Sequence, residues 1–288
     1  MEQISVIDLL YQQKDQDMIY NALPRTLRPG YFFGPHCHEN VEVCLMREGS
    51  CDIAVNGETT TVRKGDLMVI FSHMIHTFHV NSSRPADFLQ LHFRPAAFLN
   101  VGEAAGQNMK FIRYMIDHRS AYLFQPYTPQ LLSCVERICE EIGNESEAYH
   151  TALANIYIDE MVFLLSREIE QSFRRVFSIE NPIAIKAIQY INENMEGRFA
   201  LEDVALACGV STRYLSHIFR HYVNFTINDY INIAKVDRGI RYILDTSLSI
   251  GEVASKLGFS SAQYFSTVFK KYTGMTPREF KARENRDI

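Results

Sequence analysis

The chain has 288 residues, of which 47% are hydrophobic, 22% charged and 12% aromatic, and its net charge is -5. This composition excludes a disordered, collagen-like or disulfide-scaffold protein, because it supplies enough apolar side chains for more than one core. A transmembrane span and a signal peptide are excluded as well: no apolar run approaches about 18 residues, and no basic stretch precedes an apolar run in residues 1–20.

The six cysteines are spread along the chain without clustering. Together with the lack of an export signal, this predicts a reduced, cytoplasmic protein.

Residues 24–94 have the pattern of a β-rich domain. Short runs of alternating or β-branched residues are separated by Gly-containing polar turns, and Asn56-Gly57 between two such runs is typical of a tight hairpin. Many short strands at regular spacing favour an antiparallel barrel or sandwich. We therefore expect an antiparallel β-barrel within residues 1–127.

Between Thr128 and Arg175 the hydrophobic period becomes helical. Gly143-Asn144 separates two amphipathic segments, so residues 128–180 are predicted to hold an antiparallel helical hairpin and a linker. The apolar face expected for its second helix comprises Leu153, Ile156, Tyr157, Met161, Leu164 and Leu165. Two compatible roles remain open for the hairpin: covering the barrel, and forming a dimer interface.

A new domain is predicted to start near residue 181. Asn181-Pro182 has the sequence of a helix start, with Asn as the cap and Pro in the first turn. The charge also changes: residues 1–180 hold 15 Lys+Arg and 23 Asp+Glu, whereas residues 181–288 hold 14 and 11. Only the second part, which is all helical in its pattern, is expected to meet a polyanion.

This second part contains an internal repeat. The segment from Leu201 to Asn224 aligns with the segment from Ile250 to Gly274, with Ala205 over Ala254 and Gly209 over Gly258. A small residue where two helices cross and a Gly in the turn after it are what a helix-turn-helix requires. A single such match would fit any helical hairpin, but two registered copies predict two helix-turn-helix units.

The stretch from Gly258 to Phe280 closely resembles the signature of AraC/XylS-type transcription regulators, and the resemblance extends over residues 183–283. It implies two helix-turn-helix units on a long linker helix, here about residues 226–244. It also implies a recognition helix from each unit in successive major-groove segments of double-stranded DNA. The chain is thus expected to be a multidomain α+β protein whose all-α part, residues 181–288, binds DNA and is no enzyme.

The same resemblance assigns candidate DNA-binding residues. Arg213 and Gln263 are the candidates for bidentate contacts to guanine and adenine, and Arg220, Lys270 and Lys271 for phosphate contacts. The remaining base-facing candidates are Thr212, Ser216 and His217 in the first unit, and Ala262, Ser266 and Thr267 in the second. Any of the exposed cations would also be compatible with an ordinary solvated position.

Some positions depart from the family pattern. Thr267 and Lys235 stand where the family often has Arg, Gly239 stands where it usually has Ala, and Asn224 replaces a Gly. A Gly inside a helix costs ~1 kcal/mol relative to Ala, and Asn tolerates the left-handed conformation. These departures suggest that the second unit specifies its bases weakly.

The β-rich part contains the spacing Gly30-x5-His36-x-His38-x3-Glu42-x6-Gly49, followed downstream by His76. This spacing resembles the cupin motifs, and many AraC-type regulators carry a cupin as their effector domain. In metal-dependent cupins the matching four residues hold Fe, Mn, Ni or Zn. His36, His38, Glu42 and His76 are thus the candidate effector pocket, and the same four are candidate ligands of a divalent transition metal.

Three uses of these four residues stay open: a pocket for a small molecule, a metal site, and purely structural hydrogen bonding. We expect His73 and His79 to face away from His76, and we treat His92 as a separate histidine.

The sequence therefore predicts a cytoplasmic, effector-responsive regulator that binds DNA as a homodimer. A sugar is the expected effector, and RNA polymerase is a candidate partner. The alternatives are a metal-binding cupin, enzyme or sensor, fused to a DNA-binding domain, and a regulator whose barrel only dimerises. Residues 1–23 are left as a candidate arm with either domain as its docking site.

Overall fold

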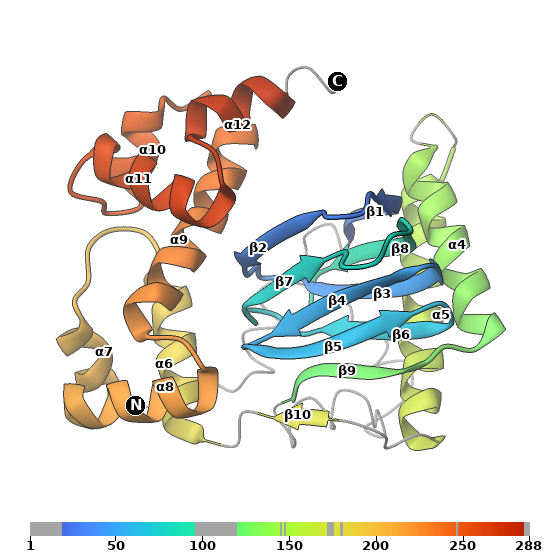
Figure 1. The fold of residues 1–288 in the computed structure, drawn as a ribbon, viewed down its shortest axis with the longest axis horizontal. Helices are drawn as coiled ribbons and strands as arrows, with labels where there is room; N and C mark the ends of the chain where they lie inside the picture. The colour runs from blue at the N-terminus through green and yellow to red at the C-terminus, as the bar shows by residue number, and fades with distance from the viewer. Residues whose placement is uncertain are drawn as a thin grey trace.

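The computed structural model describes residues 19–95, 120–144, 146, 148–171, 176–178, 181–245 and 247–284. A β-rich half and a helical half lie side by side, with the long helix α9 (Ile227–Asp245) at their border (Figure 1). Residues 179–180, just before the expected division at 180/181, and most of the candidate arm in residues 1–23 lie outside the described residues. Both the division and the arm stay predictions.

Two antiparallel sheets form the β-rich half. The first has the strand order β1-β8-β3-β6-β9-β10 and the second β2-β7-β4-β5. The strands are β1 (Ile19–Leu27), β2 (Phe32–His36), β3 (Val41–Glu48), β4 (Ser50–Val55), β5 (Glu58–Arg63), β6 (Asp66–Ile70), β7 (His76–His79), β8 (Ala86–Phe93), β9 (Ser120–Pro126) and β10 (Val176–Ser178). The antiparallel β fold is confirmed; the described strands form a two-sheet sandwich, not one closed barrel.

The predicted hairpin at Asn56-Gly57 joins β4 to β5. Both residues have positive φ, 48° and 82°, and they separate the directly paired residues Val55 and Glu58. A two-residue turn of this kind fixes the strand register, because its twist matches that of the strands.

The central strand β3 is covered on both of its faces, which explains its run of buried residues. Cys44 and Met46 belong to the apolar core between the two sheets. Val43 and Leu45 point the other way, into a core shared with the helical hairpin. Alternate side chains of one strand thus supply two separate cores.

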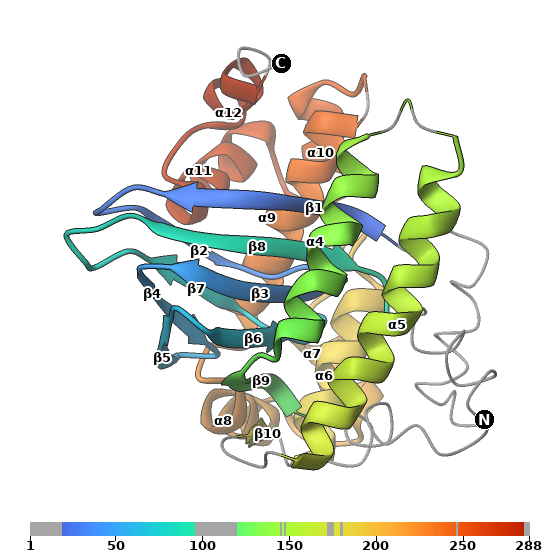
Figure 2. The same ribbon diagram turned by 90° about the vertical axis from the view of Figure 1, so that its right-hand side faces the viewer.

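The helical hairpin consists of α4 (Pro129–Gly143) and α5 (His150–Gln171), which lie across the outer face of the six-stranded sheet (Figure 2). Thr128 caps α4 by accepting a hydrogen bond from the backbone N–H of Leu131. The face expected for α5 is partly wrong, because its buried residues are Ala154, Ile158, Met161, Val162 and Leu165. Leu153 and Ile156 are exposed instead.

The helical half contains α6 (Pro182–Glu193), α7 (Leu201–Cys208), α8 (Thr212–Val223), α9, α10 (Ile250–Lys256), α11 (Ala262–Thr273) and α12 (Pro277–Glu284). Asn181 caps α6 as expected, accepting from two backbone N–H groups. Gly209 and Gly258 end α7 and α10 with φ of 71° and 70°. None of the helices in the described part of the chain is long and apolar enough to cross a bilayer.

Two of the family departures have a structural reason. Asn224 ends α8 in the left-handed region, with φ of 62°, as the sequence predicted. The buried Lys235 donates from Nζ to the carbonyl oxygens of Gly197 (3.0 Å) and Leu257 (2.7 Å). Lys235 thus ties α9 to both the loop before α7 and the end of α10.

The two halves share buried contacts. Cys37 and Ile75 of the β-rich half lie in the same apolar cluster as the helices of the other half. The Tyr230 hydroxyl donates to the carbonyl oxygen of His73 (3.0 Å), and the Asn224 side chain donates to that of Asn56 (2.8 Å). The β-rich half therefore contacts the first turn of α9 and the residues just before it.

Candidate functional sites

The recognition helices α8 and α11 begin in the same way. Ser211 and Ser261 accept hydrogen bonds from the backbone N–H groups of Tyr214 and Tyr264, at 3.3 and 3.1 Å. A turn with a Gly of positive φ, Gly209 or Gly258, joins each recognition helix to the helix that precedes it in the chain. The repeat seen in the sequence is thus a repeat in structure.

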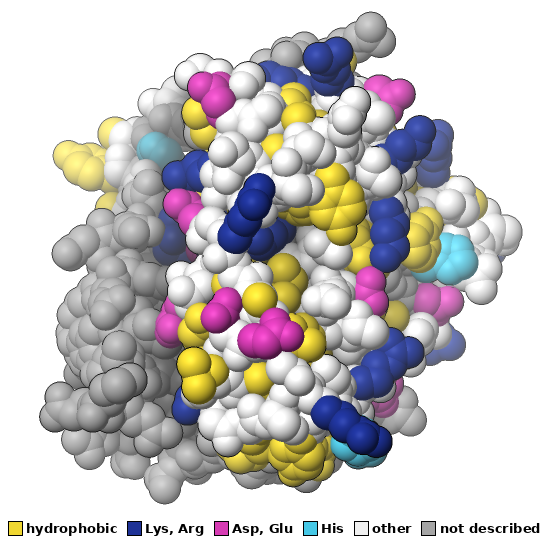
Figure 3. Space-filling view, turned by 90° about the vertical axis from the view of Figure 1, so that its left-hand side faces the viewer, with side chains coloured by type: hydrophobic (Ala, Val, Ile, Leu, Met, Phe, Trp, Pro, Cys, Tyr) yellow, Lys and Arg dark blue, Asp and Glu magenta, His cyan; other side chains and the backbone are white. Residues whose placement is uncertain are grey.

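The candidate base-contacting side chains are accessible. Arg213, His217, Gln263 and Thr267 are exposed, and their helices lie in the half of the molecule seen in Figure 3. Basic side chains are spread over this face among mostly uncharged ones (Figure 3). The other base-facing candidates, Thr212, Ser216, Ala262 and Ser266, are exposed or partly so.

Several of these groups already have partners within the chain. The hydroxyls of Ser216, Ser266 and Thr267 donate to carbonyl oxygens one turn earlier in their own helices. Such hydroxyls keep lone pairs for a donor from a base edge. Lys271 pairs with Asp229 at 3.2 Å, whereas Arg220 and Lys270 are exposed. The ion pair makes Lys271 the weaker candidate for a phosphate contact.

A surface hollow of about 710 Å³ adjoins the first recognition helix. It contains the expected Ser216, His217 and Arg220, and also His221 and Thr226, which sequence reasoning missed. Tyr214 and Tyr264, which align in the repeat, are also about half exposed. The signal that could have marked these two tyrosines is that they align with each other in the repeat.

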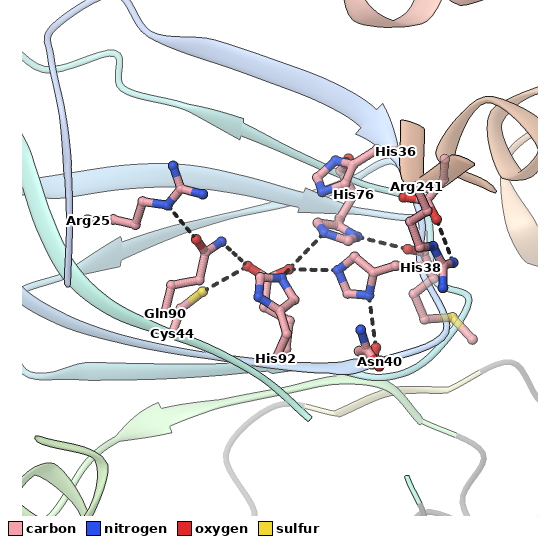
Figure 4. A network of polar contacts seen from close by, with 12 residues as sticks. Arg25, His36, His38, Asn40, Cys44, His76, Gln90, His92 and Arg241 are labelled. Atoms are coloured by element: carbon pink, nitrogen blue, oxygen red, sulfur yellow. Dashed lines mark hydrogen bonds and ion pairs between the residues drawn. The ribbon is translucent and has the colours of Figure 1, made fainter. Parts of the chain in front are cut away.

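A second candidate site lies at the end of the sandwich beside α9. The rings of His36, His38, His76 and His92 surround one carboxylate there, close to Arg241 (Figure 4). The carboxylate is that of Glu42, whose Oε2 lies 3.1 Å from His38 Nε2, 3.0 Å from His76 Nε2 and 3.4 Å from His92 Nε2. The structure thus brings together all four residues that the cupin-like spacing singled out.

His92 also belongs to this cluster, so its treatment as a separate histidine was wrong. It lies on β8 directly opposite Glu42 of β3 in the antiparallel register. Paired residues of adjacent strands point to the same face of a sheet. The signal was absent from the local sequence because the pairing joins residues fifty positions apart.

Backbone carbonyls fix the protonation of three of the rings. Nδ1 of His36 lies 3.1 Å from the carbonyl oxygen of His76, Nδ1 of His38 lies 2.9 Å from that of Asn40, and Nδ1 of His76 lies 2.8 Å from that of Met74. A carbonyl oxygen only accepts, so Nδ1 carries the proton in each ring. In a neutral ring Nε2 then presents a lone pair.

These lone pairs converge on a negatively charged oxygen. Burial would raise the pKa of Glu42, but the positive charge that the surrounding histidines carry when protonated holds it well below its usual range. With the rings neutral, a bound cation would have to supply that charge. Burial and the neighbouring His76 and His38 hold the pKa of His36 well below its usual value, so this ring is neutral. The buried Nε2 of His76 has no hydrogen-bond partner despite its short distance to Glu42.

The donor set fits a divalent transition metal. One ligand atom from each of His36, His38, Glu42 and His76 lies within 4.8 Å of the others. Ligands bound at about 2.0–2.1 Å are separated by about 3.0 Å at an octahedral right angle and about 3.4 Å in a tetrahedron. The distances from Glu42 Oε2 to Nε2 of His38 and His76, 3.1 and 3.0 Å, fall in this range. Imidazole and carboxylate are ligands that Mn, Fe, Ni and Zn accept.

Further groups orient Glu42 from the opposite side. The Gln90 side-chain amide donates to Oε1 of Glu42 at 2.6 Å, and Arg25 in turn donates to Gln90 at 3.0 Å. Such outer contacts hold a carboxylate in place.

Both halves of the chain match families of known proteins. Residues 24–162 match the family model for an AraC-like ligand binding domain, and residues 204–283 match one for a helix-turn-helix domain. An uncharacterized HTH-type transcriptional regulator of Pseudoalteromonas carrageenovora is 34% identical over 116 residues, which are 40% of this chain and 69% of that protein. The chain belongs to the AraC/XylS family of transcription regulators.

Two further comparisons extend over most of this AraC/XylS-family chain. The Msm operon regulatory protein of Streptococcus mutans is 24% identical over 257 residues, 88% of this chain and 87% of that protein. The crystal structure of ToxT from Vibrio cholerae has the same fold, with a TM-score of 0.62 and 12% identity over 91% of this chain and 96% of that one. With the two family models and the Pseudoalteromonas relative, these matches make the protein a DNA-binding transcription regulator with an AraC-like ligand-binding domain.

Proposed function

We propose that this AraC/XylS-family regulator responds to a divalent transition-metal ion held by His36, His38, Glu42 and His76, with His92 beside them. The observation that carries the proposal is the placement of three rings around the buried Glu42 carboxylate. Each ring turns Nδ1 to a backbone carbonyl oxygen, and Nε2 of His38 and His76 lies 3.1 and 3.0 Å from Glu42 Oε2. Without a cation or added protons, this arrangement sets lone pairs against negative charge. A bound ion supplies the positive charge that all of these atoms require.

The small size of the cluster argues against a sugar, the effector expected from the sequence, as the ligand of these residues. Its candidate ligand atoms lie within 4.8 Å of one another, and Glu42 and His76 are buried. This spacing suits a single ion better than a sugar ring. A sugar effector stays a prediction, and it would need a neighbouring position in the sandwich.

The experiment is a stability and metal-content measurement on the full chain. Protein purified without chelator is analysed for bound metals, stripped, and then heated with Mn²⁺, Fe²⁺, Ni²⁺, Zn²⁺ or members of a sugar panel. A ligand present at 100 times its Kd adds about 2.7 kcal/mol to the free energy of unfolding. Stabilisation by one ion that a chelator reverses supports the proposal. Stabilisation by a sugar with no effect of chelator would overturn it.

The ion would act on DNA binding through α8 and α11. We propose that Arg213 and Gln263 contact bases, that Thr212, Ser216, His217, Ala262, Ser266 and Thr267 complete the two reading faces, and that Arg220 and Lys270 contact phosphates, with Lys271 as a weaker candidate. Their exposure at the start and along the outer side of the two recognition helices supports this. Sites selected from random DNA, with and without the ion, would reveal whether occupancy changes affinity.

We also propose that two copies pair through α5. Leu153, Ile156 and Phe163 recur along one side of this helix, and Ile156 is 60% exposed. Apolar residues at such spacing match the contact stripe of a helix that packs on another.

A contact with RNA polymerase and a cytoplasmic location stay predictions from the sequence.

A further inference from the structure

Two short segments of the β-rich half separate the histidine cluster from the linker helix α9. They are residues 36–40, from the end of β2 to the residue before β3, and residues 73–76, which end on the first residue of β7. We propose that these segments form a latch that couples occupancy of the cluster to the docking of α9. The inference rests on the proposed function, because it concerns the regulation of the same site.

The side chains of the latch alternate between two directions. His36, His38 and His76 turn their rings towards the cluster (Figure 4). Cys37 and Ile75, next to them in sequence, are instead buried in the apolar cluster of the helical half. In extended chain, successive side chains point to opposite sides. Movement of a ring in the cluster therefore displaces a residue that packs against the helical half.

Glu39 makes the charged part of the contact. Its carboxylate pairs with Arg238 through Oε1 and lies 3.5 Å from Arg241 through Oε2, and both arginines are on α9. Arg241 also pairs with Asp237 of the same helix at 2.8 Å. The three side chains of the Glu39 contact are about one quarter exposed, which weakens screening by solvent.

A backbone contact completes the latch. The His73 N–H donates to the carbonyl oxygen of His38 at 2.7 Å, so the two segments are joined to each other. The His73 carbonyl oxygen accepts from the hydroxyl of the fully buried Tyr230 of α9. One connected set of contacts thus runs from the candidate ligands His36, His38 and His76 to three positions along α9.

The position of α9 matters because this helix joins the two helix-turn-helix units. A ligand that orders the cluster rings will also order the latch, and docking of α9 will become more favourable. By linkage, docking must then strengthen ligand binding by the same factor. The effector and the DNA-binding half are coupled without direct contact between effector and DNA.

The test is hydrogen–deuterium exchange of residues 224–241 in the full chain, with and without Zn²⁺. In the wild type we expect Zn²⁺ to slow exchange of this segment by about tenfold. Glu39→Gln removes the charged contact but no candidate ligand. It should speed exchange in metal-free protein and abolish the further slowing by Zn²⁺, while one Zn²⁺ per chain still binds with weaker affinity.

Arg238→Gln tests the same contact from α9 and should behave like Glu39→Gln. Glu160→Gln is the matched control, because it removes an exposed ion pair with Arg137 in the hairpin, on the other side of the molecule from α9 (Figure 1). Bound Zn²⁺ that leaves exchange of α9 unchanged would overturn the latch. So would a Glu39→Gln protein that keeps the full response to Zn²⁺.

Failure of the metal proposal gives a different result. If no Zn²⁺ binds, the metal part of the proposed function is wrong, and the latch is then judged in metal-free protein alone. Faster exchange of residues 224–241 in Glu39→Gln, but not in Glu160→Gln, supports the latch. Unchanged exchange in both variants overturns it.

Discussion

Nε2 of His76 lies 3.0 Å from Oε2 of Glu42, while Nδ1 of the same ring contacts the carbonyl oxygen of Met74. The ring therefore has no proton left to donate to Glu42 when it is neutral. Attraction between the two residues then requires a positive charge between or on them. This relationship links the buried carboxylate to a cation more directly than the motif spacing did.

Glu42→Gln should abolish tight metal binding. Gln has nearly the same shape but lacks the charge, so the affinity for Zn²⁺ should fall by about 100-fold or more, beyond the loss typical for outer contacts. Isothermal titration with metal-free protein measures this. Glu48→Gln, which removes an exposed partner of Lys64 on the same sandwich, should bind as the wild type does. Equal affinity in both variants would contradict the metal site.

Arg213→Ala and Lys270→Ala should affect DNA binding in different ways. Loss of a bidentate base contact relaxes preference at one position by ~1–3 kcal/mol. Loss of a phosphate contact weakens binding to all sequences alike and lowers the slope of log affinity against log salt by about 1. Site selection and titrations at several salt concentrations measure both.

The control for these variants is Lys64→Ala, an exposed cation of the sandwich outside the recognition helices. Unchanged base preference in Arg213→Ala would remove this residue from the interface. A salt slope in Lys270→Ala equal to that of the control would remove Lys270.

Gly258→Ala should destabilise the protein more than Gly209→Ala, although both residues have φ near 70°. A Cβ at position 258 would lie 1.9 Å from the carbonyl oxygen of Gly197, whereas one at position 209 meets no atom within 4 Å. Gly209→Ala should cost about 1–2 kcal/mol for the left-handed conformation alone. Gly258→Ala should cost about 1–3 kcal/mol more, because the backbone at Gly197 must also move to make room for the Cβ. Urea unfolding ranks them, and equal costs would refute the overlap.

Gly239→Ala should lower stability, contrary to helix propensity. Ala is favoured in a helix by ~1 kcal/mol, but a Cβ here would lie 2.9 Å from Cζ of the fully buried Phe265. Overpacking of that kind costs about 1–3 kcal/mol, which outweighs the gain. In the double variant with Phe265→Leu, the substitution of Gly239 should cost less than it does in the wild type. A rise in Tm for Gly239→Ala alone would contradict this account.

Ile156→Asp should dissociate the proposed dimer, because it places a charge in the apolar stripe of α5. Sedimentation velocity should show monomers where the wild type forms dimers. Leu206→Asp is the control, since Leu206 is 81% exposed on α7, outside the stripe. Dimers of undiminished stability in Ile156→Asp would place the interface elsewhere.

The features that depend on local pattern were predictable from the sequence. The repeat predicted both helix-turn-helix units, because a small residue and a Gly at fixed spacing are needed wherever two helices meet in this way. The linker helix predicted at residues 226–244 is observed at Ile227–Asp245. The Asn56-Gly57 hairpin followed from the positive φ that its turn demands.

Contacts between residues far apart in the sequence could not be predicted in this way, because they depend on how the elements pack. His92 joins Glu42 through strand pairing, Glu39 meets Arg238 across the two halves, and Gly239 faces a ring from α11. The exposed stripe of α5 also depended on packing, because two faces of that helix are apolar and only the sheet decides which one is buried. Local periodicity fixes the direction of a side chain within its own element, whereas its partner depends on how elements far apart in sequence pack together.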